Sequence, residues 1–204
     1  MLSRTFLWPQ GYTSAAMISV NLDAEFYGRI FYPGIDVSEG DIQRLGWTGM
    51  EYGLPHLLDC FREHGVKGTF FIPGRVAELY PDAVRAIADA GHELGCHGYE
   101  HEILAHFTPE EQLELLKKAK AAIEKAAGRA VTGFRMPEGE ITEQTLVAAK
   151  EAGFAYSSSL SNTDVPYIRQ PAGLPELPIS WTLFDLPYFT LAFDPPIPPG
   201  SARS

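Results

Sequence analysis

The 204-residue sequence predicts an α/β fold in which parallel strands alternate with helices around one core. Short apolar runs that end in polar residues recur along the chain, and segments with helical spacing of apolar residues separate them. The composition, 45% hydrophobic with 19 Gly and 16 Pro, is typical of a globular chain. We therefore expect one domain over residues 1–204, with residues 194–204 forming an irregular proline-rich tail.

The N-terminal half supplies the first strands and helices. An apolar run at residues 15–22 ends in Asp23 and is typical of a buried parallel strand. Gly65 follows the first helical segment and is a usual helix-ending residue. The remaining expected elements of this half are helices at residues 51–64 and 76–90 and strands at residues 68–72 and 92–96.

The C-terminal half continues the same alternation. Thr108, Pro109 and Glu111 predict a capping box with proline in the first helical position, and Gly128 ends this long helix. The further expected elements are strands at residues 131–134, 154–158 and 177–181 and a helix at residues 142–152. Strands that alternate with helices in this way indicate parallel βα units.

The charge balance argues against two classes of partner. Sixteen basic and 26 acidic residues give a net charge of −10, which disfavours nucleic acids and anionic membranes. No apolar run approaches the roughly 20 residues that would cross a bilayer. The two cysteines, Cys60 and Cys96, fit a reducing compartment. We expect a soluble, cytoplasmic protein.

Polar residues stand at the ends of the predicted strands. Because the carboxyl ends of parallel strands meet at one edge, residues such as Asp23 and the pair His97 and His101 are expected to converge there. Two histidines four residues apart are more often structural than metal-binding when they occur alone. Together with a strand-end carboxylate they favour one divalent cation with positions left open for water.

Four segments resemble the polysaccharide deacetylase, or NodB-homology, family in their order and spacing: GTFFIPG, GHELGCHGYEH, GFRMPEG and ELPISW. The similarity extends from about residue 15 to residue 181. Among its subgroups, the one with intracellular-type peptidoglycan deacetylases and allantoinase relatives is most similar. The resemblance implies a distorted (β/α)7 barrel, an Asp-His-His site that usually holds zinc, and hydrolysis of an N-acetyl or related amide.

The resemblance also implies roles for individual residues. Asp23, His97 and His101 match the three metal ligands of the family. Arg135 matches the arginine that orients the catalytic carboxylate, and Trp181 matches a wall of the acetyl pocket. Members of the similar subgroup often form homo-oligomers, which we also expect here. A complete barrel of the eight-stranded kind needs about 250 residues, so this sequence predicts a barrel that is truncated at its C-terminus.

The chain departs from the family at the residues that move protons. Asn21 stands where the family has an aspartate that acts as general base, and an amide cannot accept the proton, although Asn21 could orient a water. Glu25 is the first candidate replacement, because it shares the face of Asp23 if the strand stays extended. Glu138, close to Arg135, is the second. The family's late catalytic histidine has no counterpart after residue 181.

The sequence therefore predicts a metal-dependent hydrolase that acts on an N-acylated carbohydrate or a related small amide. An allantoinase-like ureide hydrolase is the alternative enzyme, favoured by the missing aspartate. A catalytically weak protein that binds metal or carbohydrate is the alternative from a different class. We interpret His92 as a structural hydrogen-bonding residue and Cys96 as a core residue.

Overall fold

The computed structural model describes residues 8–26, 44, 46–137, 141–161 and 163–185. Its centre is a seven-stranded sheet in the order β1-β2-β3-β4-β5-β7-β6. All neighbouring strands pair in parallel except β6 and β7, which are antiparallel. The strands are β1 (Ser19–Asn21), β2 (Thr69–Ile72), β3 (Glu93–Cys96), β4 (Gly133–Phe134), β5 (Tyr156–Ser157), β6 (Tyr167–Arg169) and β7 (Leu174–Glu176). The mostly parallel sheet confirms the predicted α/β class and agrees with a distorted barrel.

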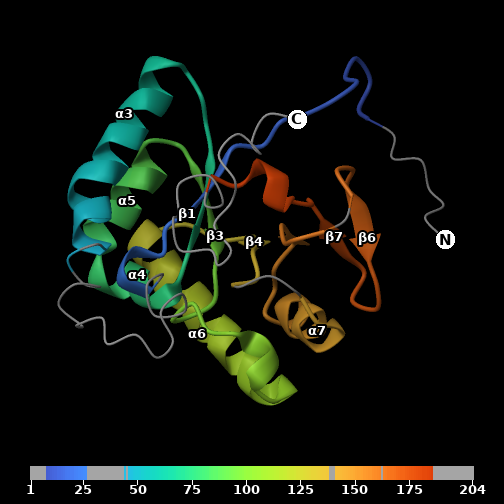
Figure 1. The fold of residues 1–204 in the computed structure, drawn as a ribbon. Helices are drawn as coiled ribbons and strands as arrows, with labels where there is room; N and C mark the ends of the chain where they lie inside the picture. Colours follow the sequence, from blue (N-terminus) through green and yellow to red (C-terminus); the bar gives the residue numbers. More distant parts are fainter. Residues whose placement is uncertain (1–7, 27–43, 45, 138–140, 162, 186–204) are drawn as a thin grey trace, which may run out of the picture.

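Helices flank the sheet along the chain. The α-helices are α3 (Leu54–Glu63), α4 (Gly74–Leu79), α5 (Pro81–Asp89), α6 (Pro109–Ala127) and α7 (Glu143–Glu151). The short helical segments are η1 (Ala24–Phe26), η2 (Gly49–Gly53), η3 (Leu104–His106) and η4 (Trp181–Leu183). Figure 1 shows α3, α4 and α5 to the left of the strands, with α6 and α7 below them. Within the described residues, no helix is both long and apolar enough to cross a bilayer.

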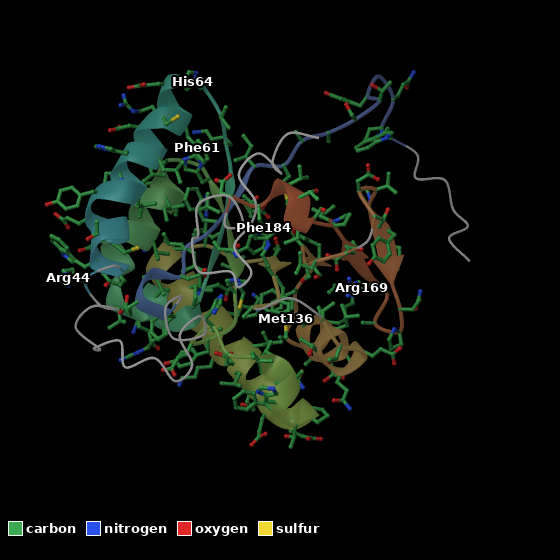
Figure 2. The ribbon with its side chains drawn as sticks, in the orientation of Figure 1. Arg44, Phe61, His64, Met136, Arg169 and Phe184 are labelled. Carbon is green, nitrogen blue, oxygen red and sulfur yellow. The ribbon has the colours of Figure 1, made fainter. Side chains whose placement is uncertain are left out.

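The core lies between the sheet and its covering helices. Every side chain of β2 is buried, as expected for a parallel strand with both faces covered. Phe61, labelled on α3 in Figure 2, packs against two buried rings. Its ring centroid lies 6.1 Å from that of Phe70 and 5.4 Å from that of His92. Nδ1 of His92 accepts a hydrogen bond from the Gly68 N–H at 3.1 Å. Cys96 is buried among core residues. The structural interpretations of His92 and Cys96 are therefore confirmed.

Helix α6 begins and ends where the sequence predicts. The Thr108 Oγ1 accepts the N–H of Glu111 at 3.3 Å, and the Glu111 carboxylate accepts the N–H of Thr108 at 2.8 Å. A cap of this kind stabilises a helix by about 1 kcal/mol. Gly128 ends the helix in the left-handed conformation at φ 71°, which costs glycine little.

The single helix predicted over residues 76–90 is wrong, because the chain forms α4 and α5 there. Tyr80 separates them with φ −126° and ψ 53°, outside the helical region. The next residue, Pro81, disfavours a helical conformation in the residue before it and lacks the N–H that would continue the helix. Pro81 instead becomes the first residue of α5, where the missing N–H costs nothing.

The strand predicted over residues 177–181 is also wrong. The last strand of the described chain, β7, ends at Glu176, and Ile179 forms only an isolated parallel bridge with Leu160. Leu177 and Ile179 still donate their N–H groups to the carbonyls of Ser157 and Ser159, at 2.8 and 3.2 Å, so the segment runs beside the end of β5 without forming a regular strand. The preceding hairpin of β6 and β7 was not predicted, and Trp181 begins η4 instead of ending a strand.

Candidate metal centre and active site

The predicted site residues emerge from adjacent strand ends. The His97 N–H donates to the carbonyl of the last residue of β2 at 3.0 Å, and the Arg135 N–H donates to the last residue of β3 at 2.8 Å. Leu22, directly before Asp23, donates its N–H to a β2 carbonyl at 2.9 Å. Because these hydrogen bonds hold the three strand ends in register, the side chains that follow come together at one edge of the sheet.

Three buried side chains converge at this edge. One ligand atom each from Asp23, His97 and His101 lies within 4.8 Å of the others. The two carboxylate oxygens of Asp23 each lie 3.7 Å from a histidine Nε2, Oδ1 from that of His97 and Oδ2 from that of His101. Two ligands that each lie about 2.1 Å from a shared ion are at most about 4.2 Å apart, so one ion can bridge both pairs.

The hydrogen bonding of His97 leaves a nitrogen suited to a metal. Its Nδ1 lies 2.9 Å from the carbonyl oxygen of Arg135, which can only accept, so Nδ1 carries the proton. Within the described part of the chain, the buried Nε2 of His97 has no hydrogen-bond partner. An imidazole fixed in this tautomer through its other nitrogen is the usual arrangement of a metal-ligating histidine.

Burial keeps both imidazoles neutral. It holds the pKa of His97 well below its ordinary value, and the neighbouring His101 adds to this effect. Burial lowers the pKa of His101 to about 4. Neutral imidazole is the form that ligates a metal, so both histidines are ready to bind near neutral pH. The donor set of one carboxylate and two imidazoles fits a divalent cation such as zinc.

Arg135 lies behind this cluster with its guanidinium hydrogen-bonded to neutral groups. Nε donates to the Ser158 carbonyl at 2.7 Å, and Nη1 donates to Oδ1 of Asn21 at 2.8 Å. Nη2 donates to the hydroxyl oxygens of Ser19 at 2.8 Å and Ser158 at 3.0 Å. The guanidinium also stacks on the ring of Phe71, 4.0 Å from its centroid. Burial lowers the pKa of Arg135 to about 10, so it stays charged at neutral pH.

The expected contact between Arg135 and a catalytic carboxylate is absent from the described residues. Asn21 occupies that place instead. Ser19, Asn21 and Asp23 alternate along β1 and its extension, which puts their side chains on one face. The face that carries Asp23 therefore also supplies two neutral hydrogen-bond acceptors to Arg135.

The expectation that Glu25 shares the face of Asp23 is wrong, because the chain does not stay extended. Ala24 has φ 47° and begins the short helical turn η1. The Glu25 Oε2 accepts a hydrogen bond from the Tyr80 hydroxyl at 3.2 Å. Gly46 packs closely against this turn, since a Cβ there would lie 2.4 Å from the Glu25 nitrogen. Tertiary packing thus directs the Glu25 carboxylate toward α4 and α5.

Two further predicted site residues remain untested. Glu138 lies outside the described residues. Trp181 begins η4, and its part in an acetyl pocket stays a prediction.

Ser19, Ser158 and Glu102 were not among the site residues predicted from the sequence. Ser19 could have been found from the sequence, because it lies two residues before Asn21 on a predicted strand and therefore shares its face. Ser158 is set by the register of β4 and β5, which one sequence does not give. Glu102 follows His101 directly, and its carboxylate accepts two backbone N–H groups of the loop that carries both histidines.

Comparison with known proteins identifies related chains. The family model described as polysaccharide deacetylase matches residues 47–157, more than half of the chain. The peptidoglycan deacetylase of Helicobacter pylori is 32% identical over 182 residues, which are 76% of this chain and 61% of that protein. The chain therefore spans less than two thirds of this relative.

Two solved structures are similar as well. A proposed polysaccharide deacetylase from Mycobacterium smegmatis has a TM-score of 0.81 and 34% identity, covering 98% of this chain and 68% of that one. A pseudoenzyme of carbohydrate esterase family 4 from Bacillus anthracis has a TM-score of 0.51 and 30% identity, covering 53% and 38%. A mutant of that pseudoenzyme is described as having restored enzymatic activity. From the family match and these likenesses, the chain belongs to the polysaccharide deacetylase, or NodB-homology, family.

Proposed function

We propose that this chain hydrolyses the amide of an N-acetylated sugar and uses one divalent cation, held by Asp23, His97 and His101. The observation that carries the proposal is the convergence of three buried ligand atoms within 4.8 Å. The Helicobacter pylori relative, named a peptidoglycan deacetylase, supports the substrate class. Zinc is the cation that we propose, because a set of two imidazoles and one carboxylate is typical of catalytic zinc.

The chain's own residues would prepare the site for this chemistry. A bound divalent cation supplies Lewis acidity toward the amide carbonyl and lowers the pKa of water. The carbonyl of Arg135 fixes the tautomer of His97, and its guanidinium fixes the side chain of Asn21. Because Oδ1 of Asn21 accepts from Arg135, its amide N–H groups are the part that can orient a water or a substrate oxygen.

A carboxylate is still required to take the proton. Glu25 is an unfavourable candidate, because its Oε2 is bonded to the Tyr80 hydroxyl. We propose Glu138 instead, which follows Arg135 by three residues in the segment after β4. Trp181 is the residue we propose for the wall of the acetyl pocket.

A second candidate function has its own supporting observation. Asn21 stands at the position of the family's base, and the described hydrogen-bond partners of the Arg135 guanidinium are all neutral. A chain with this arrangement could bind metal and carbohydrate while turning over slowly or not at all. The likeness to the Bacillus anthracis pseudoenzyme adds support for this candidate.

One paired experiment separates these functions. The zinc-loaded protein is assayed for acetate release from oligomers of N-acetylglucosamine and, in parallel, for hydrolysis of allantoin, with Asp23→Asn as the control. We expect acetate release that Asp23→Asn abolishes, and no turnover of allantoin. Zinc binding without any turnover would establish the binding protein instead. Turnover of allantoin alone would establish the ureide hydrolase.

A further inference from the structure

One carboxylate accepts two backbone N–H groups of residues 97–101, the loop that carries both histidines. Glu102 Oε1 accepts the N–H of Tyr99 at 2.8 Å, and Glu102 Oε2 accepts the N–H of Glu100 at 2.5 Å. Hydrogen bonds to a charged acceptor are about twice as strong as those between neutral groups. One side chain therefore fixes two consecutive peptide groups that lie between the two proposed metal ligands.

Two carbonyl groups of the same loop accept hydrogen bonds from α4. The Gly98 carbonyl accepts the N–H of Gly74 at 3.0 Å, and the Tyr99 carbonyl accepts the N–H of Arg75 at 2.8 Å. These two donors belong to the first turn of α4, where backbone N–H groups have no partner within the helix. The loop is thus bound to α4 through its carbonyls and to Glu102 through its N–H groups.

The backbone of the loop needs such support. His101 has φ 61°, a left-handed conformation that costs a residue other than glycine roughly 1 kcal/mol or more. Gly98 has φ 74°, and a Cβ there would lie 2.8 Å from Cγ of Pro137 and 3.1 Å from Oε1 of Glu102. This conformation brings the rings of His97 and His101 to a centroid distance of 4.8 Å.

From this geometry we infer that Glu102 is a positioning residue for the metal site. Its carboxylate holds the loop in the conformation that sets the separation of the His97 and His101 nitrogens before an ion binds. The inference rests on the proposed metal-dependent function, and Glu102 is neither a ligand nor a catalytic residue in it.

Glu100 provides a matched control. It lies in the same loop, is exposed, and takes part in the contact with Glu102 through its backbone N–H alone. Glu100→Ala removes one negative charge near the site, as Glu102→Ala does, but leaves both hydrogen bonds of the Glu102 carboxylate in place. A comparison of the two variants therefore separates the effect of losing the two Glu102 hydrogen bonds from the effect of losing a charge.

Zinc affinity is the direct test. The full chain and its Glu102→Gln, Glu102→Ala and Glu100→Ala variants are titrated with Zn²⁺ against a competing chelator. Loss of an outer partner of a metal site typically weakens binding by about 10- to 100-fold, which we expect for both Glu102 variants. For Glu100→Ala we expect a change within about threefold, because interactions of exposed charges are weak.

Each result has a definite meaning. Wild-type affinity in both Glu102 variants would overturn the positioning role while leaving the proposed function intact. An equal loss in Glu100→Ala would assign the effect to charge and would also overturn it. A wild-type chain that binds no zinc would refute the proposed metal function itself and the role of Glu102 with it.

A second measurement needs no metal. Hydrogen exchange of the Tyr99 and Glu100 amides is followed in the zinc-free protein, with thermal unfolding as a check that each variant is folded. We expect exchange about tenfold faster or more in Glu102→Ala and wild-type protection in Glu100→Ala. Glu102→Gln keeps the shape of the side chain and serves if Glu102→Ala fails to fold. Equal exchange rates of these two amides in all the proteins would overturn the proposal that Glu102 holds the loop.

Discussion

In a Glu138→Gln background, which lacks the proposed base, Asn21→Asp is expected to raise the turnover number on an N-acetylglucosamine oligomer by about 10² or more, within the 10²- to 10⁴-fold range of general-base catalysis. The substitution keeps the shape of the side chain. It places a carboxylate oxygen where Oδ1 of Asn21 now lies 2.8 Å from Nη1 of Arg135. Arg135 is only 3% exposed and is positively charged. Within the described residues, the groups that accept hydrogen bonds from its guanidinium are neutral.

The new carboxylate should be ionised at neutral pH. An opposite charge within about 4–6 Å lowers the pKa of an aspartate by about 1–3 units. With about 4 Å between the charges and an effective dielectric constant of about 20, the attraction is on the order of 4 kcal/mol. That attraction opposes both the cost of partial burial and the repulsion from Asp23 on the same face, so the carboxylate would be present in the form that accepts a proton.

The assay is steady-state acetate release by zinc-saturated protein near neutral pH, with zinc content measured for every variant. Ser19→Ala is the control, because Ser19 also bonds to Arg135 on the same strand face but cannot become a base. A change of less than about threefold when Asn21→Asp is added to a folded, zinc-loaded Glu138→Gln variant would refute the reasoning, since a general base contributes far more than that. Position 21 would then serve only to hold Arg135.

The remaining predictions concern the proton acceptor and the buried arginine. Glu138→Gln should lower wild-type turnover by about 10² or more while zinc stays bound, and Glu25→Gln should change it by less than about threefold. The opposite ranking in a kinetic assay would contradict the assignment of the base. Asn21→Asp in the otherwise wild-type chain should raise turnover far less, because Glu138 already accepts the proton there. Arg135→Met should lower the free energy of unfolding by at least about 3 kcal/mol, since it leaves several buried acceptors without a donor. A loss below about 1 kcal/mol in urea denaturation would contradict the role of those hydrogen bonds.

The sequence was sufficient for the fold class and for the convergence of Asp23, His97 and His101. Apolar runs that end in polar residues predict parallel strands, and parallel strands bring their carboxyl ends together. Asp23, His97 and His101 could therefore be predicted to converge from their places along the chain alone. Local signals were equally reliable for α6, whose cap at Thr108 and end at Gly128 depend on neighbouring residues.

One error came from a local signal that was present in the sequence. Pro81 restricts the residue before it and divides the helix predicted over residues 76–90. This proline therefore deserved more weight than the apolar periodicity of that segment.

Other features depend on contacts between distant segments and could not be predicted. The turn after Asp23 depends on the approach of Gly46, and it redirects Glu25 toward Tyr80. The partners of Arg135 depend on the register between strands far apart in the sequence. Homo-oligomeric assembly, the cytoplasmic location and the extent of the domain stay predictions from the sequence.

Zinc titration of the metal-free full chain tests the central claim most directly. The account predicts one zinc ion per chain, with binding lost in Asp23→Asn and in His101→Ala while both variants stay folded. The three buried ligand atoms within 4.8 Å are the reason for this stoichiometry. A wild-type chain that binds no zinc, or one whose zinc binding is unchanged in Asp23→Asn and His101→Ala, would contradict the account.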